Sequence, residues 1–101
     1  MTSENPQKKY RVIVADNYHY QDESENYTFG YFDTLEEAIG ACMAIVDEYL
    51  EGEFKAGISS SAMYETYKNF GDDPYVVGAD VDGVPFSAWS YAEQRCIEIC
   101  A

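Results

Sequence analysis

Apolar and polar residues alternate near the start of the chain, in a pattern that is typical of strands. Tyr10–Ala15 is rich in β-branched residues, and the alternation places Tyr10, Val12 and Val14 on one face. A second run of this kind, Tyr27–Phe32, follows after a stretch of turn-forming and aromatic residues. Two strands joined by so short a connection most simply form an antiparallel hairpin.

The period then becomes helical, which predicts a first helix after Thr34. Thr34 and Glu37 have the S/T-x-x-E spacing of a capping box, and Gly52 is expected to end the helix in a left-handed cap. The apolar residues of this segment form one stripe at helical spacing: Leu35, Ala38, Ile39, Cys42, Val46, Tyr49 and Leu50.

A shorter helix is predicted after Ser59, which can act as its N-cap, while Ile58 and Met63 can form a hydrophobic staple. The residues Gly71–Pro74 are rich in turn formers, so we expect a turn there.

A second hairpin is expected after this turn. Tyr75–Val81 reads as a strand, Asp82 and Gly83 suit a tight turn, and Val84–Phe86 would return as a short strand. Pro85 cannot donate a hydrogen bond, so the returning strand should lie at an edge of the sheet.

Ser87 can cap a third helix, whose apolar residues recur at helical spacing. Trp89 leads this series, and we therefore expect its ring to lie in the core. The series continues through Ala92, Cys96, Ile99 and Cys100.

Together these elements predict an α+β domain. A small, largely antiparallel sheet of two hairpins would pack against three helices, in the order strand, strand, helix, helix, strand, strand, helix. The length of 101 residues favours a single domain, residues 9–101, after a disordered polar leader, residues 1–8.

The charge balance narrows the class of partner. Six basic residues stand against 19 acidic ones, which gives a formal net charge of −13. Direct binding to nucleic acid or to an anionic membrane is disfavoured, because both require a basic surface. A macromolecular partner is therefore expected to be a basic protein.

The cysteines and the leader favour a cytoplasmic location. Cys42, Cys96 and Cys100 cannot all pair within one chain, which indicates free thiols in a reducing compartment, and the leader lacks the basic and apolar regions of a secretory signal. The cysteines fall on apolar helix faces, where they are expected to pack as small hydrophobic residues.

No motif predicts a catalytic residue, a metal site or a cofactor. His19 is the only histidine, and it lacks the further His or Cys ligands that a transition-metal site needs. Asp80–Gly83 resembles part of a calcium loop, but Gly78 and Trp89 fall on required acidic positions. No glycine-rich phosphate-binding motif is present.

The segment between the first two predicted strands carries more aromatic and acidic side chains than a hairpin connection requires. Tyrosine rings supply contact area at low rotamer cost, and carboxylates steer a cationic partner. We expect this segment to contact the partner through Asp16, Tyr18, His19, Tyr20, Asp22, Glu23 and Glu25.

Four segments resemble a family of short, uncharacterised bacterial proteins. They are Tyr10–Val14, Asp16–Tyr20, Gly30–Ala38 and Phe86–Ala92, which include Y-R-V-x-V-x-D-N-Y-H-Y and F-S-A-W-x-Y-A. The resemblance implies a bacterial, self-contained, intracellular domain, and it carries no activity or site residue over to this chain.

The sequence thus favours a non-enzymatic, acidic protein-protein interaction module. One version is an inhibitor of a basic protein that handles nucleic acid. The first alternative is a small enzyme or ligand-binding protein that uses His19 and neighbouring carboxylates. The second is a homodimeric module whose interface is the exposed face of its own sheet.

Overall fold

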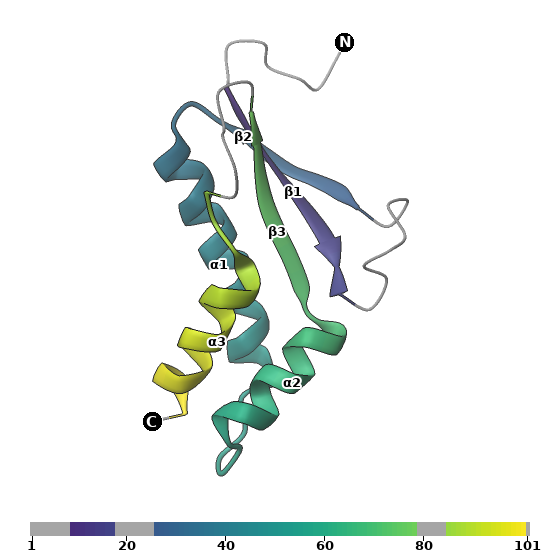
Figure 1. Cartoon of the computed structure of the whole chain (residues 1–101), viewed down its shortest axis with the longest axis vertical. Coiled ribbons are helices and arrows are strands. Elements are labelled where there is room, and N and C mark those ends of the chain that lie inside the picture. Colours follow the sequence, from purple (N-terminus) through teal and green to yellow (C-terminus); the bar gives the residue numbers. More distant parts are fainter. Residues whose placement is uncertain (1–8, 18–25, 79–84, 101) are drawn as a thin grey trace.

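The computed structural model describes residues 9–17, 26–78 and 85–100, and it confirms the α+β class (Figure 1). A three-stranded antiparallel sheet packs against three helices. Along the chain the elements are β1 (Tyr10–Asp16), β2 (Tyr27–Phe32), α1 (Leu35–Glu53), α2 (Ser60–Phe70), β3 (Asp72–Gly78) and α3 (Ala88–Ile99).

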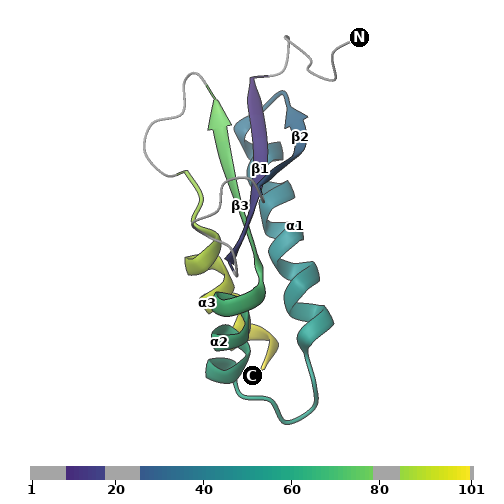
Figure 2. The same cartoon turned by 90° about the vertical axis from the view of Figure 1, so that its right-hand side faces the viewer.

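The sheet has the order β2-β1-β3, so the first strand of the chain lies at its centre. The helices α1 and α3 lie on one side of the sheet, and α2 lies at the end of the sheet where β3 begins (Figures 1 and 2). One apolar cluster joins the three helices around Leu50, Met63 and Tyr67, and another joins the sheet to α1 around Val12 and Cys42.

The predicted antiparallel pairing of the first two strands is confirmed, and it contains one irregularity. Val12 lies opposite Gly30, but Ile13 lies opposite Thr28, so Phe29 is an extra residue in β2. A β-bulge of this kind changes which residues face the helices. Val14 is buried and lies opposite Tyr27, which therefore faces the helices; without the bulge Tyr27 would share the outer face with Tyr31.

The helix starts follow the sequence, whereas the predicted end of α1 is wrong. The amide of Glu37 donates to Thr34 Oγ1 at 3.1 Å, and Glu37 Oε1 accepts from the Thr34 amide at 3.2 Å. Gly52 lies within the last helical turn, and the chain leaves α1 through Phe54 in an extended conformation. The left-handed conformation occurs instead at Gly57 (φ 89°), in the turn before α2.

The helix α2 begins as predicted. The hydroxyl of Ser59 accepts from the Ala62 amide at 3.1 Å. Ile58 packs against the buried cluster that contains Met63, as a hydrophobic staple requires.

The turn predicted at residues 71–74 is wrong, because β3 already begins at Asp72. Pro74 lies within this strand, opposite Val14. It is accommodated because β3 is an edge strand of the described sheet, where a residue without an amide hydrogen can point away from its neighbour.

The predicted fourth strand is absent from the described residues. Pro85 and Phe86 are not in a strand, while Val84 and the Asp82-Gly83 turn lie outside the described residues. The described sheet therefore has three strands instead of four.

The expectation that Trp89 is a core residue is also wrong. The buried series of α3 is Ala88, Ala92 and Cys96, so Trp89 lies one position further round the helix and is 38% exposed. Its Nε1 donates to Asn17 Oδ1 at 3.0 Å, and Asn17 Nδ2 donates to the Tyr67 carbonyl at 2.9 Å. Trp89 thus tethers α3 to the end of β1.

Candidate functional site

Only one of the residues predicted to bind a partner is in the described part of the chain. Asp16 is the last residue of β1, is half-buried and lies opposite Asp72 of β3. The remaining predicted residues lie outside the described residues: Tyr18, His19, Tyr20, Asp22, Glu23 and Glu25.

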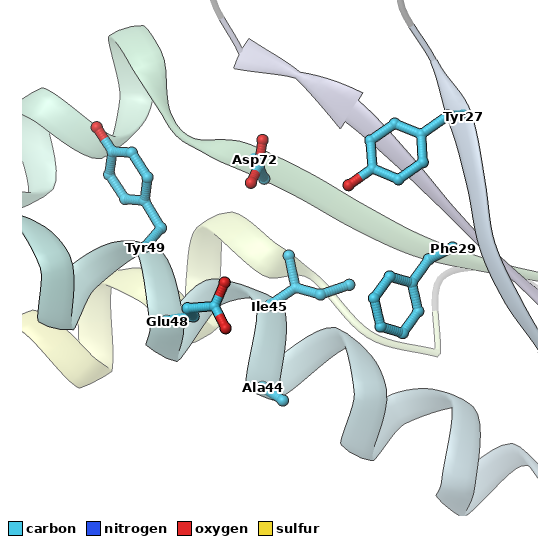
Figure 3. Close-up of a pocket in the computed structure, with 7 residues that line it drawn as sticks. All are labelled: Tyr27, Phe29, Ala44, Ile45, Glu48, Tyr49 and Asp72. Atoms are coloured by element: carbon cyan, nitrogen blue, oxygen red, sulfur yellow. The ribbon is translucent and has the colours of Figure 1, made fainter.

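Next to Asp16 and Asp72, a groove opens between β2 and α1. Its volume is about 290 Å³ (Figure 3). The groove is lined by residues from three elements: Tyr27, Phe29, Ala44, Ile45, Glu48, Tyr49 and Asp72.

Aromatic rings form both ends of the groove. Figure 3 shows Tyr27 and Phe29 of β2 at one end and Tyr49 of α1 at the other. Tyr27 is 54% exposed and Phe29 is 50% exposed, which is high for large apolar side chains on the helix-facing side of a sheet. The bulge at Phe29 places Tyr27 on this side, so the groove depends on that irregularity.

Two carboxylates, Glu48 and Asp72, lie between these rings (Figure 3). Burial raises the pKa of Asp72 above its ordinary value, and the negative charges of Asp16 and Glu48 raise it further. None of the described Lys and Arg residues lines the groove. The carboxylates therefore repel one another without a basic side chain between them.

The tyrosine hydroxyls respond to the same charges. The pKa of Tyr27 is raised by burial and then by the charges of Asp72 and Glu48. The pKa of Tyr49 is raised by burial, by Glu53 and by Asp72. Both phenols therefore stay protonated at neutral pH and can donate hydrogen bonds.

A second acid–tyrosine cluster lies on the opposite side of α1, where α1 meets α3. Arg95 Nε donates to Asp47 Oδ1 at 2.9 Å, and Arg95 Nη1 donates to Glu98 Oε1 at 2.7 Å. The Tyr91 hydroxyl lies 3.0 Å from both carboxylate oxygens of Asp47. In this cluster the chain supplies its own guanidinium.

The cysteines of the described residues are free thiols, and two of them are buried. Burial raises the pKa of both Cys42 and Cys96 to about 11, so both stay protonated at neutral pH. Within the described ranges, no group of three or more His, Cys, Asp or Glu side chains is placed to hold a metal ion. Nor is any helix there long and apolar enough to cross a membrane.

The sequence contains two signals for the groove, the aromatic residues Tyr27 and Phe29 of a predicted strand and Tyr49 in the apolar stripe of a predicted helix. No local pattern indicates that the two segments lie together. The bulge and the pairing of β1 with β3 bring the three elements together, and neither follows from local sequence patterns.

Comparisons with known proteins leave the function to be argued from this geometry. No protein-family description, curated protein or solved structure matches the chain significantly. The resemblance to short bacterial proteins therefore stays a prediction.

Proposed function

We propose that the protein is a non-enzymatic module that binds a basic protein through the groove between β2 and α1. The observation that carries this proposal is the combination of exposed rings and carboxylates in one hollow, without a basic side chain in its lining. Aromatic rings provide the apolar contact that anchors an interface. The carboxylates of Glu48 and Asp72 provide charge complementarity to a cation.

The charge of the whole chain supports a partner of this class. A net charge of −13 attracts a basic protein over a distance of about one Debye length, roughly 8 Å at physiological salt, and thereby raises the association rate. A partner that handles nucleic acid would carry such a basic surface, so inhibition of such a protein in the cytoplasm is the specific form of the proposal.

The predicted binding segment is part of the same proposal. Asp16 lies opposite Asp72 at the end of the sheet, and its charge raises the pKa of Asp72. The residues Tyr18–Glu25 connect Asn17 to Asn26, and Tyr27 follows directly. Substitution of Tyr18, His19 or Tyr20 by Ala is expected to weaken partner binding more than it changes thermal unfolding.

The experiment is affinity capture from cells that express the protein, with two matched double variants. Tyr27→Ala with Glu48→Gln alters the groove. Tyr31→Ala with Glu51→Gln alters the same strand on its outer face and the same helix outside the groove lining. Both variants change the net charge by the same amount and remove one tyrosine ring from the same strand, and the ring of Tyr31 is the more buried of the two.

We expect a basic protein to bind to the wild type and to the control variant, to be lost from the groove variant, and to elute with added salt. Equal capture by all three proteins would contradict the proposal. So would a captured protein whose binding does not respond to salt, because screening weakens contacts between exposed charges.

A further inference from the structure

The size of the groove indicates what kind of group it can hold. Pockets for small-molecule ligands usually have volumes of about 300 to 1,000 Å³ and enclose most of the ligand. The groove, at about 290 Å³, lies at the lower limit of that range and opens between β2 and α1. One side chain of a partner protein suits these dimensions better than a cofactor does.

The lining of the groove indicates the chemistry of that side chain. Three aromatic residues, Tyr27, Phe29 and Tyr49, line the groove, and the face of an aromatic ring attracts cations through its quadrupole. Glu48 on α1 and Asp72 on β3 offer carboxylates from two different elements. We propose that the groove holds an arginine side chain of the basic partner, an inference that rests on the proposed function.

Arginine fits this lining better than lysine. Its planar guanidinium stacks on aromatic rings, is weakly hydrated, and has five donors in a fixed fork that can reach two carboxylates together. The ammonium of lysine is a compact charge that holds its water more strongly. A site with rings at its ends and separated carboxylates between them therefore favours the guanidinium.

The chain itself contains a similar arrangement around an arginine. Arg95 bonds to Asp47 on α1 and to Glu98 on α3, and the Tyr91 hydroxyl shares Asp47. The groove repeats the elements of this cluster, with one carboxylate on α1, one on another element, and tyrosine beside them. The difference in the proposal is that the partner protein supplies the guanidinium.

The test is a nuclear magnetic resonance titration of the full chain with three probes: N-acetyl-arginine amide, the corresponding lysine amide and the corresponding citrulline amide. Citrulline keeps the shape of arginine but is neutral. We expect arginine to shift the resonances of Tyr27, Phe29 and Tyr49, lysine to bind about threefold more weakly, and citrulline to leave them unchanged.

Two variants locate the binding. Glu48→Gln is expected to weaken arginine binding at least about threefold, whereas Glu51→Gln, on the same helix outside the groove lining, should leave it unchanged. Equal binding of citrulline, equal or tighter binding of lysine, or shifts confined to other parts of the chain would each overturn the inference.

The inference and the proposed function can fail separately. If a basic protein is captured only when the groove is intact, but arginine amide does not bind there, the groove recognises another part of the partner and the inference is wrong. If arginine amide binds in the groove, but groove variants capture the same proteins as the wild type, the proposed function is wrong.

Discussion

Asp47 and Glu48 are neighbours in α1, yet their carboxylates have opposite surroundings. Asp47 faces α3, where it accepts hydrogen bonds from Arg95 and from the Tyr91 hydroxyl. Glu48 faces β2 and lies with Asp72 in the groove, which no described basic residue lines. Adjacent acidic residues of one helix thus serve two regions with different balances of charge.

The pKa directions show what this difference means. On the Arg95 side, the hydrogen bond that Glu98 accepts from Arg95 lowers the pKa of Glu98, and the hydrogen bonds that Arg95 donates to Asp47 and Glu98 raise the pKa of Arg95. In the groove, burial and neighbouring acids raise the pKa of Asp72. The first region stabilises its charges within the fold, whereas the second keeps charges that a cationic partner would stabilise.

The largest effect on stability is expected from Arg95→Met. This change removes two charge-assisted hydrogen bonds and leaves the Asp47 carboxylate, which is 29% exposed, without its cation. We expect a loss of about 1 to 2 kcal/mol in the free energy of unfolding, because the partial exposure of the pair limits the effect.

Urea denaturation would measure this loss, with Lys68→Met as the control. Lys68 pairs with Glu65 at 3.5 Å and lies 4.9 Å from the centroid of the Tyr64 ring, and such partly exposed contacts each contribute about 0.5 kcal/mol. If Arg95→Met were no more destabilising than Lys68→Met, the Arg95 cluster would not be a stabilised region.

The next effect compares two tyrosine hydroxyls. Tyr91→Phe removes the hydrogen bond that the Tyr91 hydroxyl donates to the Asp47 carboxylate and is expected to cost about 1 kcal/mol of stability. Tyr27→Phe removes a hydroxyl that no hydrogen bond links to another described residue, so the unfolding midpoint should be nearly unchanged. The unfolding midpoints of the two variants, measured in parallel, should therefore differ. Equal losses of stability would mean that the Arg95 cluster and the groove do not differ in how they hold their tyrosine hydroxyls.

A smaller effect of opposite sign is expected from Asp72→Asn. The raised pKa means that the folded state binds the Asp72 proton more tightly than the unfolded state does. Stability from this group is therefore lost as the pH rises from the ordinary value of 3.8 through the raised folded value. The backbone carbonyl of Asp72, which accepts from the Tyr67 hydroxyl, is unaffected by the substitution.

Thermal unfolding measured at several pH values would show whether Asp72→Asn stabilises the protein. Asp72→Asn should have a higher melting temperature than the wild type at pH 7, and the difference should shrink toward pH 3. A variant that is less stable at pH 7 would mean that the Asp72 carboxylate is already stabilised within the fold.

The smallest effect on stability is expected from Glu48→Gln. Glu48 is exposed, so the free energy of unfolding should change by no more than about 0.5 kcal/mol. Binding of the captured basic protein should nevertheless weaken, and Glu51→Gln should leave both quantities unchanged. Isothermal titration calorimetry would measure the affinity, and urea denaturation would measure the free energy of unfolding. A Glu48→Gln variant that loses stability but keeps its affinity would mean that Glu48 serves the fold instead of binding.

The parts of the fold that the sequence predicted are those set by local contacts. Thr34, Ser59 and Ser87 each cap a helix through the amide three residues later, and this spacing is visible in the sequence. The α+β class followed from the same periodicities. Local patterns therefore located the three helices and the first two strands of the described residues, and the Tyr75–Gly78 part of β3.

The predictions were wrong where contacts between residues far apart in the chain determine the local structure. Pro74 lies in a strand because β3 pairs with β1. Its partner in this pairing is Val14, which is 60 residues earlier in the chain. Trp89 is turned toward Asn17, 72 residues away, by a one-residue shift of the buried series. The groove requires the bulge at Phe29, and nothing in the alternation of Tyr27–Phe32 marks the extra residue.

The most direct test of a cation-binding groove is the titration of the Asp72 carboxyl by nuclear magnetic resonance, first in the protein alone and then with saturating N-acetyl-arginine amide. We predict a pKa above the ordinary 3.8 in the protein alone, because of burial and the charges of Asp16 and Glu48, and a lower pKa once the guanidinium is bound. A pKa at or below 3.8 in the protein alone, or one that arginine leaves unchanged, would contradict the claim that the groove keeps its negative charge for a partner's cation.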